Sequence, residues 1–306
     1  GFYMNETKLR NADANLEVEG ILSEKALELI TDKNNKNVIR GYVVFKLNDL
    51  DFVTVNVYVS EFTKNGEASK AYPNVLTVMN EYKSIAEVGE DAADRVRCKS
   101  VQVQPNSYVG KEDLMVHENV RYSASFFTRI TDPTKYEPIA RMEIEAYVQS
   151  VIDEFTVQGE ATGRLKVKLY IPTYKGVEPM DAYISETIAE DFKDMVSIGQ
   201  TVLLAGMPIN RNEIKENVIH MAMGGDIVKK SSKRISEIVF DQANPYDEDD
   251  PKSFSTEAIR AGLVERDLRL KKDKEQLELA KKTGGATSAV KPAIAQGRTL
   301  PKFMNM

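Results

Sequence analysis

Leu16-Glu-Val-Glu-Gly-Ile-Leu22 and Met142-Glu-Ile-Glu-Ala-Tyr-Val148 share an alternation of apolar residues with glutamates. Each opens a segment rich in β-branched and aromatic residues, one from about residue 15 to 129 and a shorter one from about 139 to 226. Alternation with a period of two is typical of a half-buried β-strand. The chain is therefore interpreted as a tandem repeat, and this repeat is the main evidence for its fold.

The first segment predicts three strands, one helix and further strands. In the third strand, valines at 53, 55, 57 and 59 alternate with Thr54, Asn56 and Tyr58, which predicts a core face and an outer face. Apolar residues at helical spacing follow Pro73, and Gly89 is a stop signal. The predicted strands cover residues 16–22, 38–47, 52–59, 95–103 and 121–130, with the helix at 75–88.

The second segment repeats this order. The predicted strands cover residues 140–157, 163–171, 180–184 and 201–210, with a helix at 186–196 that stops near Gly199. Three strands, one helix and closing strands are the layout of the oligonucleotide/oligosaccharide-binding (OB) barrel. We expect a mainly β fold with two tandem OB-like five-stranded barrels, each with one embedded helix, plus a C-terminal helix and a flexible tail. Two unrelated small α+β domains, or one larger β-sandwich with a helical insertion, remain alternatives.

The predicted organisation has six parts, which differ in composition. A Ser or Thr cap near residue 255 and a thin apolar stripe among balanced charges predict a mostly exposed helix up to Lys282. After Gly284 the chain becomes small, polar and basic. The parts are an N-terminal extension (1–14), a first barrel (15–138), a second barrel (139–240), an acidic linker (241–254), a C-terminal helix (255–282) and a basic flexible tail (283–306).

Composition indicates a folded, cytoplasmic chain. The 306 residues are 42% hydrophobic, and Cys98 is the only cysteine, so no internal disulfide can form. No run approaches the roughly 20 apolar residues of a membrane helix, and no secretory signal pattern is present. The net charge of −6 opposes polyanion binding. However, the acids are partly segregated in residues 241–250, next to the basic stretch Lys229-Lys-Ser-Ser-Lys-Arg234.

Signals for catalysis are weak. His117 and His220 are the only histidines, and neither has a second histidine or a cysteine at metal-ligand spacing. No phosphate-binding loop motif occurs, and Asp247-Glu-Asp-Asp250 is interpreted as a solvated linker. We assign no catalytic residue, metal or cofactor and expect a protein that is not an enzyme. A metal-dependent nuclease built from scattered carboxylates is the least favoured alternative.

The repeats carry the side chains with which a barrel binds single-stranded nucleic acid, namely aromatic rings for stacking and cations for phosphates. Arg164, Lys166 and Lys168 alternate with apolar residues, so they share one face of a strand. The aromatics could instead fill the core, and the cations could face acids across the sheet. The candidate residues are Arg40, Tyr42, Lys46, Tyr58, Phe62, Lys64, Arg97, Lys99, Tyr122, Arg129, Arg164, Lys166, Lys168, Tyr170, Tyr174 and Lys175.

Several patterns together resemble the double-barrel single-stranded DNA-binding proteins of bacteriophages. They include Ile39-Arg-Gly-Tyr-Val-Val-Phe45, Asn80-Glu-Tyr-Lys-Ser-Ile-Ala-Glu87, Thr162-Gly-Arg-Leu165, Asn244-Pro-Tyr-Asp-Glu-Asp-Asp-Pro251 and Arg260-Ala-Gly-Leu-Val-Glu-Arg266. The resemblance implies a protein that coats single strands in phage replication or recombination, in the host cytoplasm if it is phage-encoded.

The end of the chain departs from bacterial single-strand binders, since Lys302-Phe-Met-Asn-Met306 is not an acidic tip. Replication or recombination proteins could still bind the C-terminal helix and tail. A protein-interaction or assembly factor that uses the same barrels and tail is the main alternative. The sequence leaves the choice between DNA and RNA open.

Overall fold

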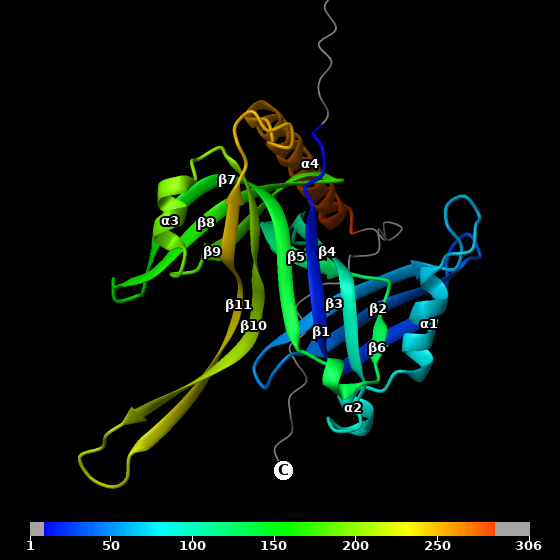
Figure 1. Ribbon diagram of the computed structural model, residues 1–306, viewed down its shortest axis with the longest axis horizontal. Coiled ribbons are helices and arrows are strands. Elements are labelled where there is room, and N and C mark those ends of the chain that lie inside the picture. Colours follow the sequence, from blue (N-terminus) through cyan, green and yellow to red (C-terminus); the bar gives the residue numbers. More distant parts are fainter. Residues whose placement is uncertain (1–8, 285–306) are drawn as a thin grey trace, which may run out of the picture.

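The computed structural model describes residues 9–284, and most of these residues lie in β-strands (Figure 1). The predicted mainly β class with a C-terminal helix is confirmed. The strands are β1 (Ala14–Thr31), β2 (Asn37–Lys46), β3 (Phe52–Ser60), β4 (Arg95–Val109), β5 (Val116–Ser123), β6 (Thr128–Ile130), β7 (Ile139–Phe155), β8 (Ala161–Thr173), β9 (Gly176–Ile184), β10 (Thr201–Ile219) and β11 (Ile227–Pro245).

The helices lie close to the predicted positions. They are α1 (Ala71–Glu81), α2 (Ile85–Val88), α3 (Ala189–Met195), α4 (Thr256–Thr283) and the short 3-10 turn η1 (Pro133–Lys135). The single helix predicted for residues 75–88 is two helices, because Ser84 forms a capping box with Glu87 and starts a new helix there. The predicted stop at Gly89 is confirmed, with φ at +83°.

The strands pair in two circuits that follow the same order. In the first half of the chain, β1, β2, β3, β5 and β4 pair in succession, and β4 pairs again with β1. In the second half, β7, β8, β9, β11 and β10 pair in succession, and β10 pairs again with β7. Helices lie between the third and fourth strands of each circuit, α1 and α2 before β4 in the first and α3 before β10 in the second.

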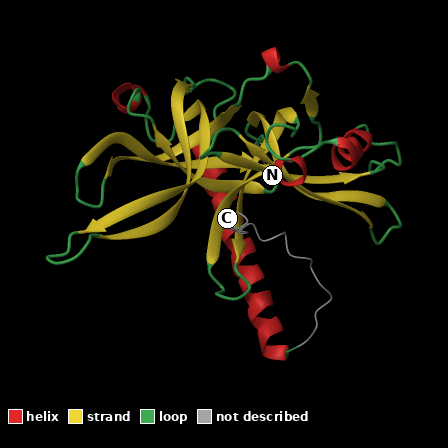
Figure 2. Ribbon diagram, turned by 90° about the horizontal axis from the view of Figure 1, so that it is seen from below, coloured by secondary structure: helices red, strands yellow, loops and turns green. Residues whose placement is uncertain are grey.

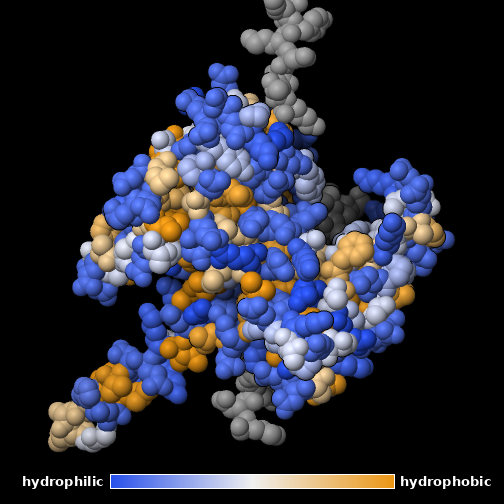
Figure 3. Space-filling view, in the orientation of Figure 1, coloured by the Kyte–Doolittle hydropathy of each residue, from blue (hydrophilic) through white to orange (hydrophobic). Residues whose placement is uncertain are grey.

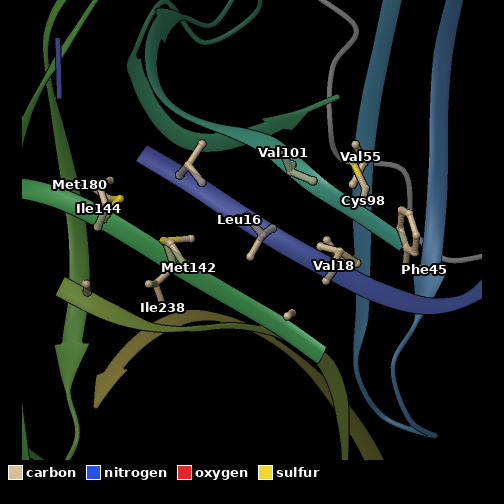
Figure 4. Packing of buried hydrophobic residues seen from close by; sticks show 14 of the residues in the cluster. Leu16, Val18, Phe45, Val55, Cys98, Val101, Met142, Ile144, Met180 and Ile238 are labelled. Carbon is tan, nitrogen blue, oxygen red and sulfur yellow. The ribbon is translucent and has the colours of Figure 1, made fainter. Parts of the chain in front are cut away.

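The two halves are joined through their first strands. Residues 14–19 of β1 pair antiparallel with residues 139–144 of β7. Leu16 and Met142 are opposite one another at this seam, and both are fully buried (Figure 4). One hydrophobic cluster extends from Phe45 and Val55 in the first half to Ile144 and Ile238 in the second. The two halves therefore share a continuous core.

The hairpin of β10 and β11 extends far beyond this core, at the lower left of Figure 1. The two strands pair continuously from Val202–Pro245 to Ile219–Ile227, with one bulge, and Gly224 lies in the connection between them. Strand β11 was not among the strands predicted from the sequence. Its last residues, up to Pro245, occupy part of the range assigned to the acidic linker.

Helix α4 begins at a cap predicted from the sequence, since the Ser255 side chain accepts a hydrogen bond from the backbone N–H of Ala258. The helix contacts β9 and β4, and its far end extends beyond the strands (Figure 2). Near that end, Lys281 donates to the carbonyl of Glu112 in the β4–β5 loop. The predicted tail beyond residue 284, and residues 1–8 of the predicted extension, lie outside the described residues.

Candidate nucleic-acid interface

The outer side chains of β2 and β3 form a surface that we call the open face. Alternation along β3 buries its valines and leaves Tyr58 exposed by 67%, as predicted. Cross-strand pairing places Tyr58 opposite Arg40, and Asn56 opposite Tyr42. Just beyond β3, Phe62 is 41% exposed. Aromatic rings therefore lie accessible along one side of β3, where flat ligands can stack on them.

Carboxylates already bind most of the predicted cations of the first half. Arg40 Nε donates to Glu28 at 2.7 Å, and Lys46 Nζ lies 3.0 Å from Glu90, which raises the pKa of the Lys46 amine. Arg97 pairs with the buried Glu19. Arg129 lies 3.7 Å from Asp94. The predicted aromatic residue Tyr42 also contacts a carboxylate, because its hydroxyl donates to Glu24 at 3.0 Å.

Three other predicted residues of the first half have different surroundings. Tyr122 packs against the core, and burial raises the pKa of its hydroxyl. Its pairing with the buried Val103 explains this orientation. Lys64 lies exposed in the turn after Phe62, and Lys99 is exposed on β4. Neither lysine forms a salt bridge with any residue between 9 and 284.

In the second half, the three predicted cations of β8, Arg164, Lys166 and Lys168, differ in whether carboxylates already bind them. Arg164 is held by Glu154 at 2.8 Å and Glu237 at 3.0 Å, and its guanidinium stacks over the Tyr183 ring at 4.2 Å. Hydrogen bonds to Glu154 raise the Arg164 pKa despite its partial burial. The side chains of Lys166 and Lys168 make no hydrogen bond or salt bridge within the described residues, although Lys166 lies close enough to Glu154 to help lower the pKa of that carboxyl. Only the two lysines are therefore available for phosphates.

Helix α4 covers the end of β8 and β9 that corresponds to the open face. Val177 is buried, and a Cβ atom on Gly262 of α4 would lie 2.4 Å from its Cγ2. Tyr170 is half-buried in the same region. At the β8–β9 turn, Tyr174 is 70% exposed and the Lys175 amine lies 5.6 Å from its ring centre.

Residues 210–236 of the β10–β11 hairpin, which we call the arm, carry cations that were not among the candidates. The register places Lys215, Lys229 and Lys233 on one face of the ribbon. None of the three forms a salt bridge with residues 9–284, whereas Lys230 on the other face pairs with Glu216 at 3.3 Å. The arm carries six Lys or Arg residues and three carboxylates, although the whole chain has a net charge of −6. Residues 229–234, Lys-Lys-Ser-Ser-Lys-Arg, show no alternation of apolar and polar residues, so the local signal was their basic composition close to Gly224 and Gly225.

The arm also exposes apolar side chains, visible as orange patches along it in Figure 3. Met223 at the turn is 90% exposed and Ile214 is 70% exposed. At the root of the arm, Arg211 donates two hydrogen bonds to Asp51, at 2.8 and 2.9 Å. Since Asp51 immediately precedes Phe52 of β3, this ion pair fixes the root of the arm to the start of β3.

No group of three His, Cys, Asp or Glu residues between 9 and 284 could hold a metal ion. Within the same range, no helix is long and apolar enough to cross a membrane.

Fold and surface together define a mainly β protein with an aromatic sheet face and a basic β-ribbon arm. The chain belongs to the YorF family, whose model, described only as YorF, matches residues 13–276. No match to a curated protein was found.

Among solved structures, the chain is similar to a deletion mutant of the single-stranded DNA-binding protein from Thermus aquaticus, with 10% identity, coverage of 79% of this chain and 98% of that chain, and a TM-score of 0.49. The wild-type protein from Thermus aquaticus gives 10% identity, coverage of 79% and 95%, and a TM-score of 0.42. A replication protein A heterotrimer bound to single-stranded DNA gives 10% identity, coverage of 84% of this chain and 70% of that chain, and a TM-score of 0.21. Because all three TM-scores are below 0.5, these similarities do not identify a ligand, and the ligand of this chain has to be inferred from its own geometry.

Proposed function

We propose that this protein binds single-stranded DNA without sequence requirement, by stacking bases on the open face and contacting phosphates with the arm. The observation that carries the proposal is the exposed Tyr58 on the outer face of β3, whose start is joined by the Arg211–Asp51 pair to an arm with three lysines that form no salt bridge within residues 9–284. Stacking is tolerant of sequence because every base has an aromatic face. Lysines on a flexible stem bind phosphates as point charges.

The proposed path follows β3 from Phe62 and Tyr58 towards Phe52, and continues past the Arg211–Asp51 pair onto the arm. Of the sequence-predicted residues, the path uses Tyr58, Phe62 and Lys64, with Arg40 and Tyr42 beside them. Tyr122 and Arg164 are left out, because the first packs in the core and the second is neutralised by two glutamates.

We also propose that each circuit of strand pairings is an OB-like barrel. The pairing order of first, second, third, fifth and fourth strand, with a helix before the fourth, supports this reading in both halves. The barrels then cover about residues 15–138 and 139–245, the second being longer than predicted because β11 ends at Pro245. The setting implied by the sequence resemblance, phage replication or recombination in a host cytoplasm, completes the proposal.

The test is a titration of a fluorescent oligo-dT strand with the intact protein across a range of salt concentrations, with a matched duplex as the control. The proposal predicts binding to the single strand alone, with an affinity that falls as salt rises. The role is non-enzymatic, so added Mg²⁺ should leave the strand intact. Absence of binding at low salt would contradict the proposal.

In that case the second candidate, a protein-assembly factor, would take the lead. One observation favours it: the exposed apolar side chains of the arm, which include Met221, Met223 and Ile227. Exposed apolar groups gathered on a projecting element are typical of protein-interaction sites.

A further inference from the structure

The second half of the molecule contains a cavity between the outer face of β7 and β8 and the first turns of α4. Its volume is about 430 Å³, within the range of roughly 300–1,000 Å³ that is typical of ligand pockets. Tyr147 and Tyr170 line it from the sheet, and Ile259 and Leu263 line it from the helix. We call it the cavity under α4.

Two aromatic side chains line this cavity from the sheet, the largely buried Tyr147 and the half-buried Tyr170. Tyr147 and Tyr170 are cross-strand neighbours whose ring centres lie 6.2 Å apart at an interplanar angle of 20°. The hydroxyls of Tyr147 and Thr256 are 3.1 Å apart, which ties the sheet ring to the helix. Near-parallel rings beside a space with a mixed polar and apolar lining suit a planar aromatic ligand such as a nucleobase.

The polar lining suits the edge and the phosphate of a nucleotide. Gln149 and Arg260 are exposed and line the cavity, and neither makes a side-chain hydrogen bond or salt bridge with residues 9–284. A side-chain amide offers both donors and an acceptor to a base edge. A guanidinium presents a fork of donors that matches phosphate oxygens.

Lys168 and Lys166 extend the site along β8. They share the outer face with Tyr170, and a strand rise of about 3.3 Å per residue places Lys168 roughly 7 Å from it. The acid directly opposite Lys168 is Asp181, which forms no salt bridge with it. Two unpaired amines therefore lead from the cavity along the sheet.

The wall formed by α4 is rigid. Glu178 of β9, 2% exposed, accepts from Arg269 at 2.9 Å and lies 3.6 Å from Arg266. Gly262 packs against Val177 with no room for a Cβ atom. The cavity is therefore pre-formed, and a ligand does not have to order its walls.

We propose that the cavity under α4 holds one nucleobase of a bound single strand, with the neighbouring phosphates on Arg260, Lys168 and Lys166. The proposal rests on the proposed function and assigns to the second half a single-base pocket where the first half has an open stacking surface. It makes α4 part of the binding site.

The first test is photo-crosslinking of the intact protein to oligo-dT that contains a single 5-iodouracil, with the crosslinked peptides identified by mass spectrometry. The proposal predicts crosslinks to Tyr170 or Tyr147 as well as to the open face. Crosslinks confined to β3 and the arm would overturn the pocket and leave the proposed function intact. If the wild-type protein bound no oligonucleotide, both would fail.

The second test compares affinities for unmodified oligo-dT. Tyr170→Leu keeps an apolar side chain but loses stacking, and should weaken binding roughly tenfold, whereas Tyr170→Phe should bind like the wild type. Arg260→Gln should weaken binding and lower its salt dependence. Lys272→Gln, about three turns further along α4, is the matched control and should change neither.

Thermal unfolding of each variant shows whether it folds. Wild-type affinity in folded Tyr170→Leu would overturn the pocket. If that variant did not fold, Arg260→Gln beside Lys272→Gln would decide, and equal affinities in these two would count against the proposal.

Discussion

The outer face of β2 and β3 is open, whereas the corresponding face of β8 and β9 is partly covered by α4. Both faces arise from the same alternation of buried apolar and outward polar residues, and the strands around them pair in the same order. They differ because α4, which belongs to neither circuit, packs on one face and leaves the other exposed. The comparison teaches that one strand pattern gives either a surface or a pocket, depending on what packs against it.

The contacts that hold α4 are concentrated at one buried carboxylate. Glu178 accepts hydrogen bonds from Ser107 of β4 and from Arg269 of α4, with Arg266 close by. This cluster joins the first half, the second half and the helix. Removing this carboxylate is the most direct way to detach α4 and so to remove the difference between the two faces.

The largest effect is expected for Glu178→Ala, which leaves two arginines near a buried site without their carboxylate. We expect the free energy of unfolding to fall by about 3–5 kcal/mol, measured by chemical denaturation. Glu118→Gln removes a more exposed partner of Arg266, at 3.1 Å, and should cost less than about 1 kcal/mol. Equal losses in the two variants would contradict a buried clamp.

Glu145 should show the next largest effect, and its effect should depend on pH. Burial alone would raise its pKa, but hydrogen bonds from Arg10, the Asp13 backbone and the Tyr246 hydroxyl lower it from 4.5 to about 2. These bonds fasten residues 10–13 and 246 to the second half. A lowered pKa means that the stabilisation is complete above about 4.5 and is lost as pH falls towards 2.

Glu145→Gln should therefore lower the free energy of unfolding by on the order of 3 kcal/mol at neutral pH. Denaturation over a pH series should show the difference from the wild type shrinking between pH 4.5 and pH 2. A difference that does not change with pH would count against this assignment.

The arm tests how far the open face extends. Replacing Lys215, Lys229 and Lys233 with glutamine should lower the slope of log affinity against log salt by roughly 2, since each lost phosphate contact on a single strand contributes about 0.7. Lys230→Gln is the control, because Lys230 pairs with Glu216 on the opposite face. An unchanged slope in the triple variant would show that the arm does not contact the phosphates of the bound strand.

The smallest effect on binding is expected for Arg164→Gln, because two glutamates already neutralise this guanidinium. Its salt slope should match the wild type, whereas Lys166→Gln with Lys168→Gln should lower the slope by about 1.4. The same oligo-dT titrations measure both. If Arg164→Gln lowered the slope as much as the two lysine changes, Arg164 would contact phosphate despite its ion pairs with Glu154 and Glu237, which would contradict this prediction.

Local alternation predicted which side chains point outward, and long-range pairing decided what they can do there. The valines of β3 and the leucines of β8 gave the orientation of Tyr58 and Lys166 correctly. Arg164 could not be distinguished from Lys166 by pattern, because one of its partners, Glu237, lies 73 residues away on β11. Tyr122 was a candidate for stacking, but its register with the buried Val103 turns it towards the core.

The arm and the cavity were missed for different physical reasons. Residues 227–234 of the arm are exposed, so Lys229-Lys-Ser-Ser-Lys-Arg234 shows no alternation of apolar and polar residues and was interpreted as a basic stretch rather than a strand. The cavity has no local signal, because Tyr147 and Thr256, which bond across its edge, are 109 residues apart. Helix α4 itself was predicted, but the face that it covers depends on Glu178, whose burial no local pattern predicts.

The central claim is that bases stack on the open face, and the oligo-dT affinity of Tyr58→Leu beside that of Tyr58→Phe tests it most directly. Since Tyr58 is 67% exposed, neither change should affect folding. We predict that Tyr58→Leu binds roughly tenfold more weakly and that Tyr58→Phe binds like the wild type, because only phenylalanine keeps the stacking ring. Wild-type affinity in Tyr58→Leu would contradict the account.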